Sequence, residues 1–355
     1  MRRVLLAAGV TAAVTALAAG CSSSAASSGS PGSSSGGSSN SAPVTLRLGF
    51  LANITHASAL VALKEGFFAK DLGKNVTLKT SVFSSGTQET TALLAGQLDA
   101  AYVGPNPAIN AWQKSGGKAI KIISGAASGG AALVVKPGIS SVSQLKGQKL
   151  ATPSLGNTQD VALRYYLKQH GLTTSQTSGG DVPITPIAPN SDAVLEFKSG
   201  QIAGGWEPAP YDIEMQQDGG KVLVNEASLW PGGKFVTTNL VVAQSFLAAH
   251  PSAVTGLLKA QIQANSFINQ NTSAAETAAN AELTSLTGKA LKSSVLPLAF
   301  KAITFTNDPI ASSLATDAKH AEAVGLLKPV NLAGIYDLGP LNALLKADGQ
   351  AQVSP

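Results

Sequence analysis

The side chains that could bind or transform a small molecule gather in short loops that follow apolar stretches. The loops span residues 51–56 (LANITH), 84–87 (SSGT), 104–107 (GPNP), 126–130 (AASGG), 154–159 (SLGNTQ) and 206–208 (WEP). They are rich in Gly, Ser, Thr and Asn, which supply hydroxyls, amides and unhindered backbone N–H groups. Because free N–H groups at the start of a helix favour a negative charge, converging loops of this kind predict a site for a small anion.

The charged residues point to a site without an arginine clamp. After the N-terminal region the chain has only Arg47, in a predicted strand, and Arg164, in a predicted helix. Neither lies in a loop, so the bidentate contact that a free amino acid would favour is not evident. Hydroxyls and N–H groups alone suit an oxyanion such as sulfonate or nitrate. We interpret Glu89 and Asp160, which stand in first helical turns, as partners of the helix N-terminus.

Each loop residue also has a purely structural interpretation. A single Ser, Thr or Asn before a helix is more often a cap than a ligand contact, so the hypothesis depends on convergence. Trp206 could line a pocket or belong to the core. Glu207 could meet an ammonium or hydroxyl of the ligand, or be a solvated loop residue. His56 could donate to an anion or lie at the surface, and we favour the pocket.

The elements that must position these loops follow one plan twice. The apolar pattern predicts strand, helix, strand, helix and strand over 44–104, and the same order returns over 148–208. The third strands align in sequence, GQLDAAYVG (96–104) with GQIAGGWEP (200–208). Residues 131–138 and 235–246 are candidate strands that cross between the two units, and the remainder is mainly helical.

This order predicts an α/β protein of two βαβαβ lobes joined by a two-strand hinge. Lobe 1 is expected to comprise residues 43–132 and 240–355, and lobe 2 residues 133–239. In open α/β sheets, ligands bind outside the carboxyl ends of the strands. The loops above lie at such ends, so the two lobes would present them to one cleft.

The N-terminus predicts export. Arg2 and Arg3 precede an apolar run that ends at Cys21, the single cysteine of the chain. This is typical of a secretory signal over residues 1–21, and LAAGC resembles the lipobox of bacterial lipoproteins, whose cysteine is lipidated. The alternative is an ordinary cleaved signal with an incidental cysteine. Residues 22–42 are almost wholly Ser, Gly and Ala, which predicts a flexible tether to the outer face of the cell membrane.

Other classes of protein are disfavoured. The net charge of +5 is too mild, and too evenly spread, to indicate nucleic-acid binding. The four histidines form no HExxH pair, and no GxSxG, Walker or GxGxxG motif is present. We therefore predict no catalytic residue, no metal and no cofactor, although a site can be assembled from distant segments.

Four blocks of the sequence carry a family resemblance: residues 48–68, 84–109, 150–167 and 204–238. They resemble the substrate-binding lipoproteins of ABC importers for aliphatic sulfonates, taurine and nitrate, over nearly all of residues 44–350. The resemblance implies a type II periplasmic-binding-protein fold, a monomer, and delivery of the ligand to a permease and an ATPase subunit.

The resemblance also implies which loop residues surround the cleft. Together with Ser128 of the 126–130 loop, the candidate ligand-binding residues are Asn53, His56, Gly86, Thr87, Asn106, Gly156, Asn157, Thr158, Trp206 and Glu207. The ligand itself stays open. A sulfonate-like anion, alkanesulfonate or taurine, is the first expectation; nitrate, bicarbonate or a thiamine-pyrimidine precursor would use the same fold. An enzyme of the pyrimidine-synthesis type and a surface lipoprotein without a ligand are more remote alternatives.

Overall fold

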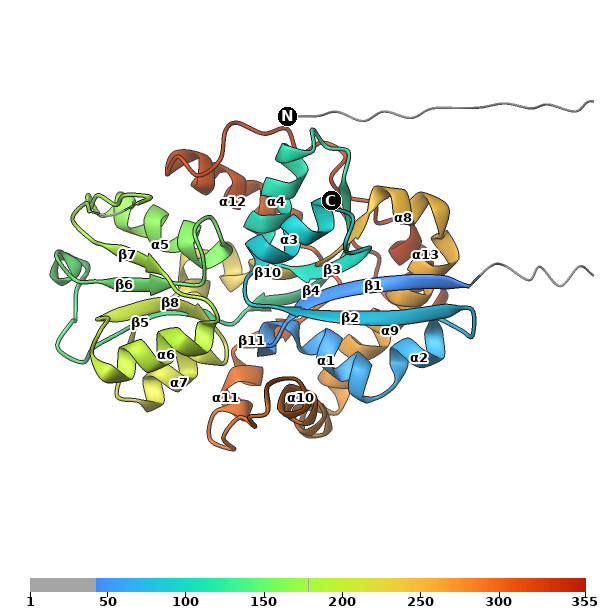
Figure 1. Ribbon diagram of the computed structural model, residues 1–355, viewed down its shortest axis with the longest axis horizontal. Helices are drawn as coiled ribbons and strands as arrows, with labels where there is room; N and C mark the ends of the chain where they lie inside the picture. Colours follow the sequence, from blue (N-terminus) through green and yellow to red (C-terminus); the bar gives the residue numbers. More distant parts are fainter. Residues whose placement is uncertain (1–42, 178) are drawn as a thin grey trace, which may run out of the picture. The chain divides into compact units, whose positions relative to one another are not determined.

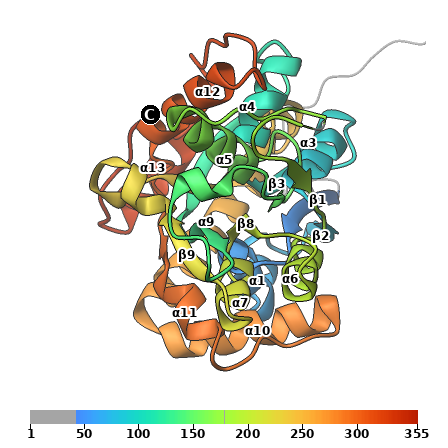
Figure 2. The same ribbon diagram turned by 90° about the vertical axis from the view of Figure 1, so that its left-hand side faces the viewer.

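The computed structural model describes residues 43–177 and 179–355, and two mixed β-sheets organise this part of the chain (Figure 1). The predicted signal, Cys21 and the tether lie outside the described residues. Helices cover both faces of each sheet (Figures 1 and 2). No helix in the described part is long and apolar enough to cross a membrane.

The first sheet has six strands in the order β11-β4-β10-β3-β1-β2. The strands are β1 Val44–Leu51, β2 Val76–Phe83, β3 Ala100–Val103, β4 Ile120–Gly129, β10 Val236–Ala243 and β11 Ile303–Phe305. β1 pairs in parallel with β2 and β3, whereas β10 runs antiparallel to both β3 and β4. The predicted crossing strand at 235–246 is therefore β10, and it enters the middle of this sheet.

The second sheet has five strands in the order β7-β6-β8-β5-β9. The strands are β5 Ala131–Val135, β6 Leu150–Thr152, β7 Ile184–Pro186, β8 Gly204–Pro208 and β9 Lys221–Asn225. Here β6 pairs in parallel with β7 and β8, just as β1 pairs with β2 and β3 in the first sheet. The repeated plan predicted from the sequence is thus confirmed strand by strand.

The helices follow the strands in the predicted order. In the first half they are α1 Ala57–Lys64, α2 Phe67–Asp71, α3 Gly86–Leu94, α4 Pro105–Lys114, α5 Thr158–Gln169, α6 Asn190–Ser199 and α7 Tyr211–Gln217. The C-terminal part contributes α8 Gln244–Ala249, α9 Pro251–Gln270, α10 Thr272–Thr287, α11 Leu296–Lys301, α12 Ala311–Ala323 and α13 Gly339–Ala347. Short 3₁₀ helices are η1 Ile54–His56, η2 Val142–Leu145, η3 Glu226–Leu229 and η4 Pro231–Gly233.

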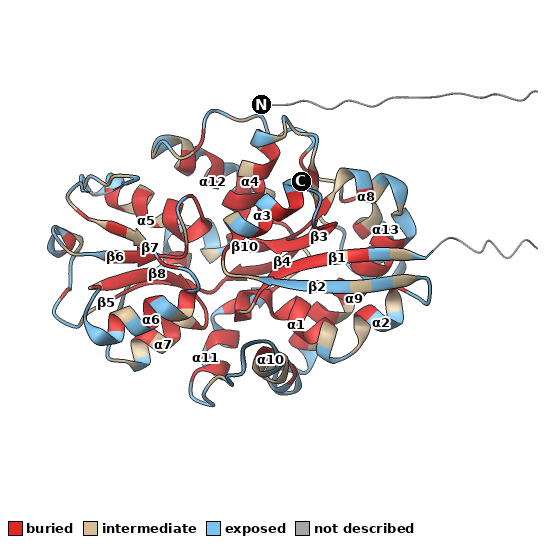
Figure 3. Ribbon diagram, in the orientation of Figure 1, coloured by how far each residue is buried: buried red, intermediate tan, exposed pale blue. Residues whose placement is uncertain are grey.

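Both faces of the central strands are buried, which explains their almost continuous apolar sequences (Figure 3). In β3, Ala100 and Tyr102 pack into one core beside α1 and α9, while Ala101 and Val103 pack into another beside α4. Residues of the C-terminal helices α9 and α10 also belong to the first of these cores. These helices therefore pack on the first sheet, whereas α12 contacts both α4 and α5.

The chain changes sheets at two places. The first is Gly129–Gly130, between β4 and β5, where φ is 83° and 73°. A Cβ at Gly130 would lie 2.4 Å from Ile303 Cγ1, so the close passage requires glycine. The second lies between β9 and β10, through η3 and η4. The lobe boundaries at 132/133 and 239/240 stay a prediction, and they fall inside β5 and β10.

Candidate functional site

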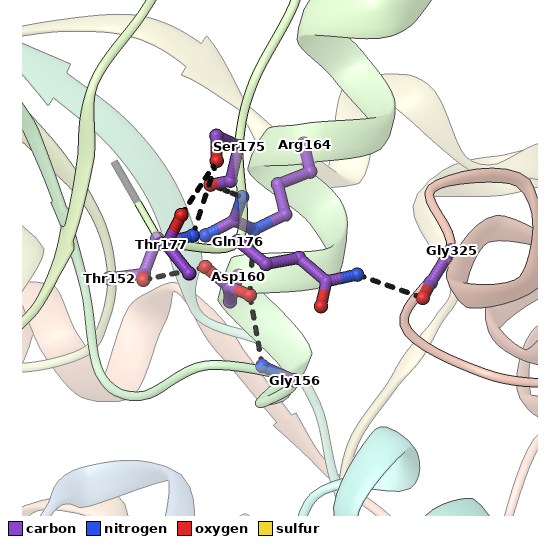
Figure 4. A network of polar contacts seen from close by, with 8 residues as sticks. All are labelled: Thr152, Gly156, Asp160, Arg164, Ser175, Gln176, Thr177 and Gly325. Atoms are coloured by element: carbon purple, nitrogen blue, oxygen red, sulfur yellow. Dashed lines mark hydrogen bonds and ion pairs between the residues drawn. The ribbon is translucent and has the colours of Figure 1, made fainter. Parts of the chain in front are cut away.

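The turn from β6 to α5 is held from the inside by one carboxylate (Figure 4). Asp160 Oδ1 accepts a hydrogen bond from Thr152 Oγ1 at 2.9 Å, and Oδ2 accepts from Gly156 N and Arg164 Nε, also at 2.9 Å. Both partners of the Asp160–Arg164 ion pair are buried. The interpretation of Asp160 as a helix-start partner is confirmed, and it explains why the chain turns sharply at Gly156, whose φ is 75°. The same interpretation is wrong for Glu89, whose carboxyl oxygens are buried without a hydrogen-bond partner among the described residues.

Because Asp160 holds this turn, the residues after Gly156 keep free polar groups. Asn157 is the N-cap of α5, but its side chain makes no capping hydrogen bond. Thr158 Oγ1 is buried and has no hydrogen-bond partner among the described residues. The first N–H groups of an α-helix have no acceptor within the helix. The start of α5 therefore offers N–H and hydroxyl groups to a ligand.

The corresponding turn of the first sheet, from β1 to η1, is arranged differently. Asn53 Oδ1 accepts hydrogen bonds from Thr55 Oγ1 at 2.8 Å and from His56 N at 3.2 Å. His56 Nδ1 accepts from Leu51 N at 3.2 Å, so in the neutral ring Nε2 carries the proton. Burial lowers the pKa of His56 to about 3, which keeps the ring neutral at physiological pH. His56 can act only as a neutral donor.

The two turns meet at a small cavity of about 20 Å³. Its lining comes from loops of both sheets: Leu51, Asn53, Thr55, His56, Gly86, Gly104, Asn157, Thr158, Gln159, Asn190, Pro208 and Thr237. This space holds little more than one water molecule or one compact polar group. The cavity is therefore a site for the head of a ligand, not for a large molecule.

The N-termini of α3, α4, α5 and α6 converge on this cavity. Gly86 and Asn190 are the first residues of α3 and α6, Gly104 is the N-cap of α4, and Asn157 is the N-cap of α5. Each contributes the positive end of a helix dipole, although Pro105 and Pro107 leave Asn106 as the one N–H donor among the first three residues of α4. Among the described residues, the lining contains no Lys, Arg, Asp or Glu. The cavity is thus suited to an anion held by neutral donors.

Glycine lets the loops that precede α3 and α4 approach the β6–α5 turn. A Cβ at Gly104 would lie 2.4 Å from Thr158 Oγ1, and one at Gly86 would lie 3.4 Å from Asn157 Oδ1. Beside the cavity, Thr87 Oγ1 and Ser154 Oγ lie 3.0 Å apart and share a hydrogen bond across the same boundary. The loops are therefore closed over the cavity in this structure.

A larger groove of about 340 Å³ continues from the cavity. It shares Leu51, Asn53 and Asn190 with the cavity. Its other walls come from the end of β2 and from α6, α7 and α10, and they include Phe83 and Tyr211. Tyr211 Oη donates to Ala52 O at 2.9 Å and so fixes this wall. A ligand with its head in the cavity has room here for a further group.

Comparison with known proteins shows the family of this chain. A model of the NMT1-like family matches residues 39–282. The chain belongs to the NMT1-like family. A binding protein of Brucella abortus (strain 2308) is 28% identical over 231 residues, which cover 64% of this chain and 68% of that protein. The taurine-binding periplasmic protein of Escherichia coli (strain K12) is 28% identical over 206 residues, covering 58% and 61%.

Solved structures confirm the predicted periplasmic-binding-protein fold of this NMT1-like chain. The alkanesulfonate-binding protein SsuA from Xanthomonas axonopodis pv. citri, bound to MOPS, has a TM-score of 0.69 at 18% identity, over 84% of this chain and 100% of that one. The nitrate-binding protein NrtA from Synechocystis PCC 6803 gives 0.72 at 15%, over 86% and 89%. The desulfurization enzyme DSZB gives 0.62 at 16%, over 86% and 99%, so this fold also occurs in an enzyme.

The predicted site residues divide into two groups. Five line the cavity: Asn53, His56, Gly86, Asn157 and Thr158. The preferred pocket position of His56 is thereby supported, and the surface alternative is wrong. Thr87 is engaged with Ser154, and Gly156 N with Asp160. Neither lines the cavity.

Three further predictions are not met by the geometry. Asn106 is buried and its Nδ2 donates to Asp317 O at 3.4 Å, away from the cavity lining. Ser128 lies within β4, where its Oγ accepts from Phe235 N at 3.4 Å. Trp206 packs fully buried in the core of the second lobe and donates from Nε1 to Glu226 Oε2 at 2.6 Å. The core interpretation of Trp206 is therefore the right one.

Glu207 is neither solvated nor part of the cavity lining. It is fully buried, so the alternative of a solvated loop residue is wrong. Its Oε2 accepts from Asn190 Nδ2 at 2.8 Å, while Oε1 has no partner among the described residues. Burial raises the pKa of Glu207 well above its ordinary value. The Glu207 carboxyl is therefore linked to the cavity through its hydrogen bond with Asn190, which does line the cavity.

Sequence reasoning passed over several lining residues. Thr55, Gly104, Gln159 and Pro208 lie in loops that it singled out, but they were not chosen. Asn190 and Thr237 were missed altogether. The signal for Asn190 was available, because it starts a helix directly after the strand at 184–186. Thr237 belongs to β10, and only the path of that strand between β3 and β4 brings it to the cavity.

Proposed function

We propose that this protein is the extracytoplasmic solute-binding component of an ABC importer and that it captures a small sulfonate-like organic anion, an alkanesulfonate or taurine. The observation that carries the proposal is the convergence of four helix N-termini on a cavity whose described lining includes a neutral His56 but no Lys, Arg, Asp or Glu. Neutral N–H and hydroxyl donors in such an arrangement favour an oxyanion without demanding a full counter-charge.

The size of the site supports an organic anion. The cavity of about 20 Å³ accepts only a compact head, and the adjoining groove of about 340 Å³ accepts the organic part. An ammonium group, as in taurine, would find a partner in the buried Glu207 carboxyl through a small shift of Asn190. A cation there would favour the ionised carboxylate and lower its raised pKa.

A bare oxyanion is the second candidate. The cavity alone is small, which favours nitrate or bicarbonate over a ligand with a long chain. A thiamine-pyrimidine precursor would instead need the groove. An enzyme of the pyrimidine-synthesis type would differ by forming a product, and among the described residues no group of three or more His, Cys, Asp or Glu side chains could hold a metal.

The proposal extends to location and partners. In it, the chain is exported, anchored through lipid on Cys21 to the outer face of the cell membrane, and monomeric. It passes the ligand to a permease that works with an ATPase, and it needs no cofactor. Hinge closure at Gly129–Gly130 and before β10 would bring the two lobes together around the ligand.

A ligand panel tests the function. Melting temperatures would be measured with taurine, short and long alkanesulfonates, nitrate, sulfate and bicarbonate. A ligand that binds only the native state at about 100 times its Kd adds about 2.7 kcal/mol to the free energy of unfolding. With an entropy of unfolding of about 2.1 cal/mol/K per residue, that is a rise of about 4 °C for a protein of this size. We expect the largest rise with a sulfonate.

A matched pair of variants checks that the response comes from the cavity. Thr158→Val should reduce the rise, whereas Thr91→Val, an exposed threonine on α3, should leave it unchanged. A rise with nitrate or bicarbonate and none with any sulfonate would transfer the assignment to the second candidate. Conversion of an added sulfinate or pyrimidine precursor to a product would instead indicate an enzyme and would overturn both binding assignments.

A further inference from the structure

A second pocket, of about 340 Å³, lies apart from the candidate site and shares no lining residue with it. Its lining comes from α5, from the η3–η4 segment and from α12. Figure 2 shows α5 beside α12. The residues that matter for its chemistry are Tyr165, Tyr166, His170, Glu226, Trp230 and His320. No part of the proposed anion site uses them.

The walls of this pocket are aromatic rings held by one another. Tyr165 and His320 stack with centroids 3.7 Å apart and planes 16° apart. Trp230 stacks on Phe235 at 5.5 Å and lies 5.6 Å from His320. The rings that face the pocket are only partly buried. Because these rings stack on neighbouring rings, their orientation is set before any ligand binds.

One buried carboxyl group forms part of the same pocket. Glu226 is 1% exposed, and its Oε2 accepts from Trp206 Nε1 at 2.6 Å. Burial raises the pKa of Glu226 to about 7, against hydrogen bonds from Trp206 and Trp230 that lower it. No Lys or Arg occurs among the described residues that line the pocket. The pocket thus combines a buried carboxyl group with aromatic faces.

This combination selects one class of ligand. Aromatic faces attract a cation through the ring quadrupole, and most strongly where water is displaced. A desolvated carboxylate is stabilised by a positive charge close by. A primary ammonium would need acceptors for three N–H groups, whereas a quaternary ammonium needs none. Because one oxygen of Glu226 already accepts from Trp206, few acceptors remain for N–H donors.

We propose that this pocket is a binding site for a small quaternary ammonium compound, whose cationic head contacts the rings of Tyr166 and Trp230 and pairs with Glu226. The site is independent of the proposed anion site, since the two have no lining residue in common. Failure of one assignment therefore leaves the other intact.

Calorimetric titration of the full chain tests the proposal with choline, tetramethylammonium and 3,3-dimethyl-1-butanol, which has the shape of choline without its charge. We expect both cations to bind and the neutral alcohol to bind at least about tenfold more weakly. Glu226→Gln keeps an acceptor for Trp206 Nε1 and removes the charge. It should weaken choline about tenfold, while the exposed control Glu65→Gln should not.

A second pair of variants keeps the test valid if the buried change disturbs folding. Gln169 is exposed at the rim of the pocket, so both of its charged replacements should fold normally. Gln169→Lys should weaken choline binding about threefold, and Gln169→Glu should strengthen it by a similar factor. Equal binding of choline and the neutral alcohol, or no response to either change at Gln169, would overturn the proposal. So would the absence of binding by both cations.

Discussion

The two turns that meet at the cavity occupy the same place in the repeated plan, yet they satisfy their polar groups in opposite ways. In the β1–η1 turn, the Asn53 amide accepts from Thr55 and His56 and so closes the turn by itself. In the β6–α5 turn, Asp160 does this work from the next helical turn, with Arg164 behind it. Asn157 and Thr158 are thereby left free for a ligand.

The comparison answers whether such residues are caps or contacts. A polar residue at a helix start is available to a ligand only when another group has taken over its structural task. Asn53 lines the cavity but is already engaged, whereas Thr158 lines it with a hydroxyl that has no partner among the described residues. The unpartnered Thr158 should therefore affect mainly affinity, whereas Asn53 and Asp160, which hold the two turns, should affect mainly stability.

The largest expected effect comes from removing Asp160. Asp160→Ala leaves the buried Arg164 guanidinium without its counter-charge, which should lower the free energy of unfolding by about 3–5 kcal/mol. Asn53→Ala removes only a local cap and should cost about 1 kcal/mol. Urea denaturation of both variants measures the difference. Equal losses would mean that the two turns are held alike.

The contact of the β6–α5 turn with the start of α4 can be blocked at Gly104. The added Cβ of Gly104→Ala would lie 2.4 Å from Thr158 Oγ1, so closure over a ligand should be strained. Overpacking of this kind costs about 1–3 kcal/mol, which corresponds to a loss of affinity of about 5- to 150-fold. In a Thr158→Ala background the clash disappears, and Gly104→Ala should then have little further effect. Additive losses would argue against the contact.

His56 should make protein stability depend on pH, whereas the residues of the β6–α5 turn that line the cavity have no titratable side chain. The pKa of His56 is lowered to about 3 in the folded protein, whereas an unperturbed histidine has a pKa of about 6.5. Below about pH 6.5 the unfolded chain therefore binds a proton that the folded protein does not bind. The free energy of unfolding should fall by about 2 kcal/mol from this group between about pH 7.5 and about pH 5. His56→Asn should lose that part of the dependence; an unchanged pH profile would contradict the buried neutral ring.

The smallest expected effects come from Thr158 and Thr55, one threonine of each turn, both of which line the cavity. Thr158→Val removes a hydroxyl without a protein partner, so ligand affinity should fall about 5- to 10-fold with little change in melting temperature. Thr55→Val removes a hydrogen bond to Asn53 and should lower the free energy of unfolding by about 1 kcal/mol. Melting curves with and without ligand report both quantities. The reverse pattern would exchange the roles of the two turns.

The sequence predicted the loops better than the individual residues. The loops at 51–56 and 154–159 both reach the cavity, because strand ends and helix starts follow from local pattern. Within them, however, Gly156 serves its own turn, and Thr55 and Gln159 line the cavity instead. Periodicity places a residue at the end of a strand but does not say which of its atoms are already hydrogen-bonded.

Trp206 illustrates the same limit. An aromatic residue beside a strand-end loop fits a pocket wall and a core equally well on sequence grounds. In the fold, Trp206 faces the core of the second lobe, and the aromatic residue that does border a pocket is Trp230. The direction of a side chain on a short strand depends on register, which is set by the neighbouring strands.

The sequence by itself determined the two repeated units, the crossing strands and the absence of an arginine from the binding loops, since these follow from hydrophobic period, chain order and composition. Only the tertiary structure decided which polar groups are left without partners, and it brought Asn190, Thr237 and Gly104 to the cavity and Tyr165 to His320. These are contacts between residues far apart in the chain, and they depend on how the packed elements meet.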